Sequence, residues 1–167
     1  MRRPTCKSRT SGLRGKQSII FDMAQEYEYL KLSNQLCFPL YACANEVIKL
    51  YKPVLDPLDL TYTQYITMLA LWENDTMSVK KLGELLHLDS GTLTPVLKKL
   101  EGKGYIKKER SALDERSVNV TVTEQGVLLK QKAAEVPLKV GSCIALTKEE
   151  ATALYTLTHK LLNSFDE

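Results

Sequence analysis

The chain has 167 residues, 44% of them hydrophobic and 26% charged, which indicates an ordinary globular protein of one domain, or one small domain with an arm. No apolar run approaches the roughly 20 residues of a membrane span, and no secretory signal is recognisable, so a cytoplasmic protein with no membrane association is expected. The net charge of +3 comes from residues 1–22, which hold six basic side chains and one acidic one; the rest of the chain holds 17 basic and 19 acidic side chains. Bulk charge therefore cannot bind nucleic acid, and any such surface must come from local clusters of basic residues.

The N-terminal part predicts an arm followed by a helix. Residues 1–22 are polar, basic and without periodicity, so they are expected to be disordered, with Met23 as an alternative true start. A basic arm that touches the DNA backbone is the functional alternative. From about residue 31 to 51, apolar residues recur at helical spacing. Pro39 must lie in the first turn of that helix or bend it, and two later prolines predict its end.

Three helices with capping residues follow. Thr61-Tyr62-Thr63-Gln64 has capping-box spacing and opens an apolar helix through Trp72. Ser78 is the predicted cap of a short helix from Val79 to about His87. Asp89 and Ser90 begin a helix of about residues 91–102. A short capped helix before a Ser/Thr-rich one is typical of a helix-turn-helix.

The remaining chain predicts a β-hairpin and two helices. Strands are expected at about 105–110 and 117–122, and the second alternates valines with polar residues. Thr123 is the predicted cap of a helix to about Val136, and Thr147 opens a second capping box for the C-terminal helix.

This order of elements predicts a mainly α fold with a β-hairpin wing, a winged helix-turn-helix with N- and C-terminal dimerisation helices. The predicted divisions are a disordered arm at 1–22, an N-terminal dimerisation helix at 23–56, the DNA-binding domain at 57–122 and C-terminal dimerisation helices at 123–167. Long apolar terminal helices are more than one small domain needs to bury, and such helices commonly close a homodimer.

The second helix of a helix-turn-helix lies in the major groove, with its first residues facing the base edges. Short polar side chains stand at those places here, lysines suited to phosphate oxygens follow, and the hairpin adds a basic tip whose arginine suits a narrow minor groove. The predicted DNA-binding residues are Ser90, Thr92, Thr94, Lys98, Lys99, Lys108, Arg110, Asp114 and Arg116. The alternative is a helical domain that does not bind DNA and whose lysines are only solvated. The order of capped helix, Ser/Thr-rich helix and basic hairpin favours binding to double-stranded DNA.

Four cysteines stand at positions 6, 37, 43 and 143, none of them in a CxxC pair, and the chain has only two histidines. This spacing predicts no metal site and no cofactor. Scattered thiols in a reducing compartment are usually small core residues. We expect Cys43 to be one, and from its surroundings alone Cys37 would be expected to be one too. Cys6 is expected to be incidental.

From about Lys31 to Glu167 the chain resembles MarR-type winged-helix repressors, and within them the organic-hydroperoxide-sensing OhrR type. The resemblance rests on Leu36-Cys37-Phe38-Pro39-Leu40-Tyr41 together with Leu88-Asp89-Ser90-Gly91-Thr92-Leu93-Thr94-Pro95. The wing run Asp114-Glu115-Arg116 is typical of the wider superfamily and is less specific.

The resemblance implies a dimeric repressor that binds a palindromic operator and releases it when an organic hydroperoxide oxidises the thiolate matching Cys37. It implies that tyrosines of the partner subunit, matching Tyr51 and Tyr62, hydrogen-bond this sulfur; Tyr41 lies one helical turn from Cys37. It further implies either an intersubunit disulfide, for which Cys143 is the candidate resolving thiol, or a mixed disulfide with a low-molecular-weight thiol. Arg116 matches an arginine placed in the minor groove.

Two other functions are compatible with parts of this sequence. A MarR-type repressor released by an aromatic or phenolic ligand would leave Cys37 without a redox role. A thiol peroxidase would need rapid recycling of Cys37, and the chain has no CxxC or thioredoxin-like pattern. The sequence therefore predicts a regulator and not an enzyme.

Overall fold

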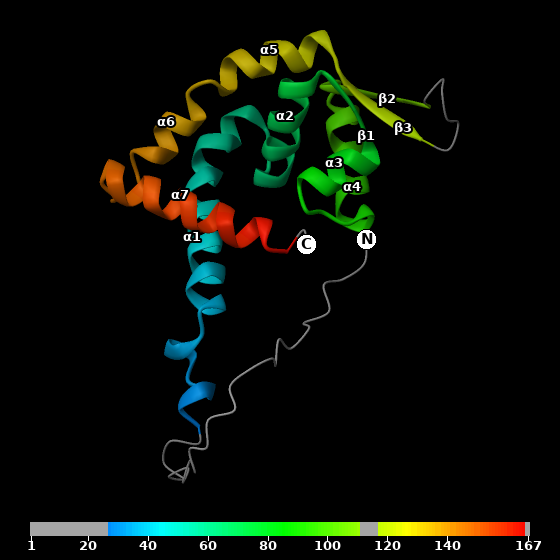
Figure 1. Cartoon of the computed structure of the whole chain (residues 1–167). Coiled ribbons are helices and arrows are strands. Elements are labelled where there is room, and N and C mark those ends of the chain that lie inside the picture. Colours follow the sequence, from blue (N-terminus) through cyan, green and yellow to red (C-terminus); the bar gives the residue numbers. More distant parts are fainter. Residues whose placement is uncertain (1–26, 111–116, 166–167) are drawn as a thin grey trace. The chain divides into compact units, whose positions relative to one another are not determined.

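The computed structural model describes residues 27–110 and 117–165, which form two compact units (Figure 1). One unit comprises the described residues up to Asn45 and those from Leu146 onward, and the other comprises Glu46–Ala145. Helix α1 (Cys37–Leu55) begins in the first unit and ends in the second. None of the described helices is long and apolar enough to cross a membrane.

The first unit contains two 3₁₀ turns, η1 (Glu28–Leu30) and η2 (Leu32–Asn34), the start of α1, and helix α7 (Lys148–Asn163). Thr147 closes the predicted capping box of α7: its hydroxyl accepts from the Glu150 amide, and the Glu150 carboxylate accepts from the Thr147 amide. No residue of α7 is buried within the described chain, although the helix carries Leu154, Tyr155 and Leu157. Exposed apolar groups of this density mark interaction surfaces, which agrees with the predicted dimerisation role of these segments. That role stays a prediction.

The second unit is a winged helix-turn-helix. Along the chain it comprises η3 (Asp56–Leu58), α2 (Tyr62–Asn74), β1 (Thr76–Ser78), α3 (Val79–Leu85), α4 (Ser90–Gly102), β2 (Ile106–Arg110), β3 (Val118–Val122), α5 (Glu124–Ala133) and α6 (Val136–Gly141). The strands form one antiparallel sheet in the order β1-β3-β2. In the β2–β3 hairpin, Ile106 pairs with Val122 and Arg110 with Val118.

One hydrophobic core holds this unit together. Leucines from α1, α2, α3 and α4 meet the sheet there, and the fully buried members include Leu55, Met68, Leu71, Leu82, Leu93, Leu97, Leu100 and Val120. The three leucines of α4 recur at helical spacing. They bury one face of that helix and leave the opposite face in solvent.

Most local predictions are confirmed. The caps at Thr61, Ser78, Asp89 and Thr123 all form, and the two strands of the hairpin lie within a residue of the predicted ranges. Pro39 lies in the first turn of α1, as its chemistry requires.

Three predictions about boundaries and burial are wrong, and one strand was not predicted. Helix α1 starts at Cys37 and not near residue 31, because the preceding residues form 3₁₀ turns, and it continues through Pro53 to Leu55. Strand β1 was not expected. The helix after Thr123 ends at Ala133, and α6 follows it as a separate helix. Cys43 is exposed within the described chain, so it is not a core residue there.

Candidate functional site

The sulfur of Cys37 stands at the start of a long helix. Cys37 is the first residue of α1 and is exposed, and no acidic residue lies in the first turn. The amides of a first helical turn have no partner within the helix, and the positive end of the helix dipole favours an anion nearby. Tyr41, one turn further on, is also exposed. The sulfur is therefore accessible to an oxidant.

The predicted sulfur-contacting tyrosines Tyr51 and Tyr62 are brought together by α1 and α2. Their ring centroids lie 4.9 Å apart in an edge-to-face arrangement, and Tyr65 lies 5.7 Å from Tyr51. Both residues are half-buried, and no buried polar side-chain atom among the described residues lacks a hydrogen-bond partner, so a phenol oxygen of this pair without a partner is open to solvent. We call Tyr51, Tyr62 and Tyr65 the tyrosine cluster.

Two members of the tyrosine cluster have a raised pKa. Burial raises the pKa of the Tyr51 phenol above 10.0, and the neighbouring Tyr62 phenol adds to the effect. Burial also raises the pKa of Tyr65, with smaller contributions from Tyr51 and Tyr62. Tyr51 and Tyr65 therefore keep their protons at neutral pH and can only donate to an anion, as a thiolate partner requires.

Cys143 follows α6 and is exposed. Its Sγ lies 3.4 Å from the Lys139 carbonyl oxygen, and its amide donates to the Val140 carbonyl at 3.0 Å. The thiol is thus accessible in its own unit. Cys6, also named from the sequence, lies outside the described residues.

Helix α4, the predicted DNA-recognition helix (called the reading helix below), has the expected polar face. The Asp89 carboxylate accepts two hydrogen bonds from Thr92, one from its amide at 2.9 Å and one from its hydroxyl at 3.2 Å. The bond from the Thr92 amide is the main reason that the pKa of Asp89 lies below its usual value. Ser90, Thr92 and Thr94 are exposed, as are Lys98 and Lys99. The cap fixes the first turn, and the exposed hydroxyls and ammonium groups can meet base edges and phosphates.

The hairpin carries two of the predicted DNA-binding cations, Lys108 and Arg110. Arg110 is exposed at the end of β2. Lys108 is half-buried and its Nζ lies 2.8 Å from a carboxylate oxygen of Glu101, whose pKa is lowered chiefly by this hydrogen bond. Lys108 therefore braces the hairpin against α4. The tip residues Asp114 and Arg116 lie outside the described residues.

A cleft of about 520 Å³ lies where α3, α4 and the hairpin meet, and one of the cations that line it was not predicted from the sequence. Thr94 and Lys108 line it together with Lys80, which is exposed in the first turn of α3. The sequence signal for Lys80 is its place in the first turn of the helix capped by Ser78. The first helix of a helix-turn-helix crosses the DNA backbone, so a lysine there can contact a phosphate.

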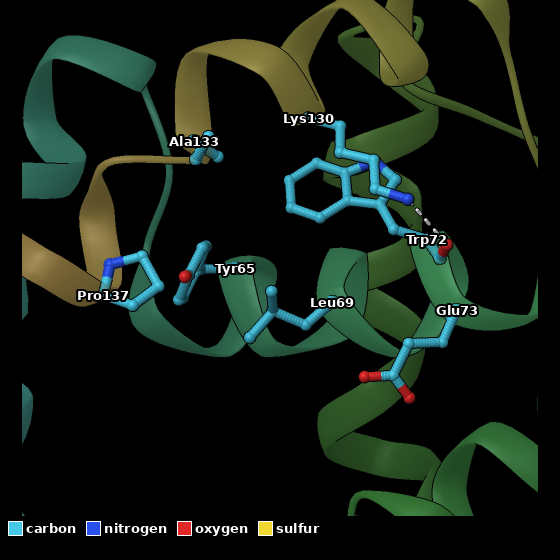
Figure 2. A pocket seen from close by; sticks show the side chains of 8 residues that line it. Tyr65, Leu69, Trp72, Glu73, Lys130, Ala133 and Pro137 are labelled. Carbon is cyan, nitrogen blue, oxygen red and sulfur yellow. Dashed lines mark hydrogen bonds between the residues drawn. The ribbon is translucent and has the colours of Figure 1, made fainter.

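A smaller cavity of about 290 Å³ lies between α2 and the α5–α6 segment (Figure 2). Tyr65, Leu69 and Trp72 line it from α2, and Ala133 and Pro137 from the other side. The Trp72 indole N–H donates to the Gly126 carbonyl at 2.9 Å, and Lys130 Nζ donates to the Trp72 carbonyl at 3.0 Å. The walls of this cavity are mostly apolar. No cluster of three or more metal-binding side chains occurs in the described part of the chain.

Comparison with known proteins gives consistent results. The family described as "Transcriptional regulator SarA/Rot" matches residues 49–133. The chain is 49% identical over 146 residues to the organic hydroperoxide resistance transcriptional regulator of Bacillus subtilis, covering 83% of this chain and 97% of that protein.

Two solved structures of AbfR, a protein of Staphylococcus epidermidis, are also similar. Reduced AbfR bound to DNA is 34% identical with a TM-score of 0.66, covering 84% of this chain and 98% of that one. Disulfide-formed AbfR is 31% identical with a TM-score of 0.58, covering 87% and 100%.

Proposed function

Because this chain belongs to the MarR-type winged helix-turn-helix transcriptional regulators, in their organic hydroperoxide resistance branch, we propose that Cys37 is its sensor. The chain is a transcriptional regulator and not an enzyme. Reduced, it is a homodimer that represses by binding a palindromic operator; oxidised at Cys37 by an organic hydroperoxide, it releases that DNA. The observation that carries this function is an exposed thiol at the first residue of α1, in a chain with a complete helix-turn-helix.

The first turns of α4 supply the DNA contacts. Ser90, Thr92 and Thr94 face the base edges in the major groove, while Lys98 and Lys99 contact phosphates. Their exposure opposite the three buried leucines of α4 supports this assignment. Arg110 adds a further cation, the resemblance assigns Arg116 to the minor groove with Asp114 nearby in the sequence, and Lys108 holds the hairpin in place through Glu101.

The switch is a two-electron oxidation of sulfur. The Cys37 thiolate attacks one peroxide oxygen, the O–O bond breaks, and the alkoxide leaves and takes up a proton to become an alcohol. The sulfur keeps the transferred oxygen as a sulfenic acid. A second thiol, from Cys143 of the partner subunit or from a low-molecular-weight thiol, then condenses with it to form a disulfide and release water.

Phenolic donors stabilise the reduced state. Tyr51 and Tyr62 of the partner subunit donate to the Cys37 thiolate, with Tyr41 nearby on the sensor's own helix. Support comes from the paired rings of Tyr51 and Tyr62, which are both half-buried in one unit. Hydrogen bonds to an ion contribute about 1.5–3 kcal/mol each, so losing them in two subunits can shift a dimer away from its DNA-competent form.

The test uses an operator selected by the reduced protein from a pool of random DNA. Binding is measured for wild type, Cys37→Ser and Cys143→Ser before and after cumene hydroperoxide, and again after dithiothreitol. Wild type should release reversibly and Cys37→Ser should stay bound. Release of Cys37→Ser to the same extent as wild type would contradict the sensor assignment. If oxidised wild type migrates as a disulfide-linked dimer on a non-reducing gel and oxidised Cys143→Ser does not, the disulfide with Cys143 is the resolving step.

The alternative is release by an aromatic ligand, and the cavity of about 290 Å³ beside Trp72 favours it. Pockets of roughly 300–1,000 Å³ suit small ligands, so only a compact phenol or carboxylate would fit. This alternative requires that such a ligand release the operator from Cys37→Ser as readily as from wild type. A narrowing substitution, Ala133→Leu, should then abolish release by the ligand while leaving release by peroxide unchanged.

A further inference from the structure

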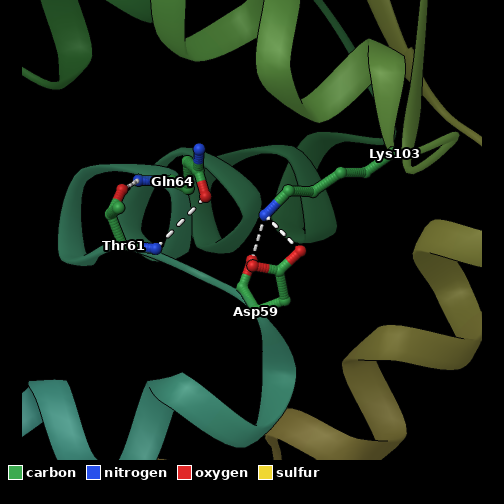
Figure 3. A network of polar contacts seen from close by, with 4 residues as sticks. All are labelled: Asp59, Thr61, Gln64 and Lys103. Carbon is green, nitrogen blue, oxygen red and sulfur yellow. Dashed lines mark hydrogen bonds and ion pairs between the residues drawn. The ribbon is translucent and has the colours of Figure 1, made fainter.

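One polar contact in the second unit joins segments 44 residues apart in the sequence (Figure 3). Lys103 caps the C-terminal end of α4, and its Nζ lies 2.9 Å from Oδ2 of Asp59. The same ammonium group also donates to the Asp59 carbonyl oxygen. The Lys103 side chain is 24% exposed and that of Asp59 is 83% exposed. A mostly buried lysine stem thus holds both the side chain and the backbone of one residue.

Asp59 belongs to a fixed turn between α1 and α2. It ends η3 with φ 52°, in the left-handed region, and its amide donates to the Asp56 carbonyl at 3.0 Å. The next amide, of Leu60, donates to the Leu55 carbonyl at 3.2 Å, and both leucines are buried. The turn is therefore anchored at both ends, so a displacement of either helix end moves Asp59 with it.

The two ends of this turn lead directly to the tyrosine cluster. Tyr51 stands one helical turn before Leu55 in α1, and Tyr62 is the first residue of α2. Their ring centroids lie 4.9 Å apart, so the two phenols are in contact directly and are also connected along the chain through the turn. A change in the separation of these phenols must be accommodated at the turn that Lys103 holds.

The other end of the contact is the reading helix itself. The Lys103 amide bonds to the Lys99 carbonyl of α4 at 3.1 Å, and Leu100 fixes the same end in the core. Helix α4 has 13 residues, a rod of about 20 Å that carries Ser90 and Thr92 at its far end. Movement of one end of a rod this short is passed on to the other.

We propose that the Asp59–Lys103 pair is a positioning contact that passes the state of the tyrosine cluster to the reading helix. The inference rests on the proposed function, because it needs a sulfur whose oxidation displaces Tyr51 and Tyr62. Neither residue of the pair touches the oxidant. An ion pair whose carboxylate is 83% exposed contributes little to the stability of a fold, so removing this one leaves a folded protein in which DNA binding and sensing are less tightly linked.

The measured quantity is the ratio of operator Kd after and before cumene hydroperoxide, for full-length protein. The variants are Lys103→Met, Asp59→Asn and the double variant. Asparagine tolerates the left-handed backbone at this position, so Asp59→Asn removes the charge without strain. Lys52→Met is the matched control, because Lys52 pairs with Asp56 at the same 2.9 Å in the same connection and does not reach α4. Thermal unfolding verifies that each variant is folded.

Wild type should show a large ratio, and each single variant a ratio at least five times smaller. The double variant should lose no more than the larger single loss, because residues that act as one unit are not additive. Lys52→Met should match wild type within twofold. A lost phosphate contact would weaken both states equally and leave the ratio intact. Folded single variants that keep the wild-type ratio would overturn the inference alone, whereas a wild type that never releases DNA would overturn the proposed function and the inference together.

Discussion

The oxygen of Tyr51 offers the sharpest test of the sensor. Tyr51→Phe removes this single atom and keeps the ring, so the packing against Tyr62 and Tyr65 at 4.9 and 5.7 Å is retained. Each such aromatic pair contributes about 0.5–1.5 kcal/mol beyond its buried area. No hydrogen bond contributes to the raised pKa of Tyr51, so loss of the hydroxyl should change the free energy of unfolding by less than about 0.5 kcal/mol. That corresponds to a fall in Tm of about 2 °C or less.

The effect on DNA binding should be larger. Loss of one charge-assisted bond of about 1.5–3 kcal/mol in each subunit removes about 3–6 kcal/mol from the competent dimer. If about 99% of the reduced dimer is competent, this leaves roughly 40% at the lower figure and well under 1% at the upper one. The operator Kd of the reduced protein should therefore rise by about 3-fold to about 250-fold, for the same population arithmetic.

Fluorescence anisotropy of labelled operator DNA in dithiothreitol measures this Kd, and a thermal melt of the same sample measures stability. Tyr105→Phe is the matched control, because Tyr105 is a half-buried tyrosine of the same unit that lies outside the tyrosine cluster. An unchanged Kd together with normal release by peroxide would refute the contact between Tyr51 and the sulfur. A fall in Tm beyond 5 °C, by the same scale roughly 1–3 kcal/mol, would instead show that the hydroxyl has a buried partner.

Three further results are expected. Because burial raises the folded-state pKa of Tyr51 and Tyr65, their contribution to stability is fully present below pH 10.0 and is lost as the pH rises through the folded-state values; urea unfolding across that window should show it, with a shallower decline in Tyr51→Phe. The pKa of Asp89 is lowered, so its contribution is present above pH 3.8 and is lost as the pH falls through its folded value; circular dichroism in acid should show Asp89→Asn, which still caps, to be less sensitive. Gly126→Ala would place a Cβ 2.2 Å from the Tyr105 carbonyl oxygen, so a melt should reveal a loss of several kcal/mol, on the order of the largest single-substitution effects.

Local chemistry explains why much of this fold could be predicted. A capping side chain bonds to an amide three residues away, so Thr61, Ser78, Asp89 and Thr123 identify their helix starts without knowledge of the rest. The buried leucines of α4 follow from periodicity in the same way. The predicted site residues Tyr51 and Tyr62 do come together, which a resemblance implied and periodicity alone could not.

What could not be predicted depends on distant partners. Strand β1 has three residues and forms because it pairs with β3, in which Thr121 lies opposite Thr76. The break between α5 and α6 is marked by no glycine, and Pro137 alone did not locate it. The contact of Lys103 with Asp59 joins residues that have no common motif. A lysine near a helix end is an ordinary surface residue until the turn that it holds is known.

Trp72 is the only tryptophan of the chain, and this gives the protein a built-in optical probe. Its indole is 8% exposed, is fixed by the Gly126 carbonyl, and lines the cavity between α2 and the α5–α6 segment. Intrinsic fluorescence therefore reports the packing of this one place, without labels and in the unsubstituted protein. A quenched signal on adding a phenol would indicate occupancy of the cavity, while a spectral change that follows peroxide and reverses with dithiothreitol would time the arrival of the redox signal at α2.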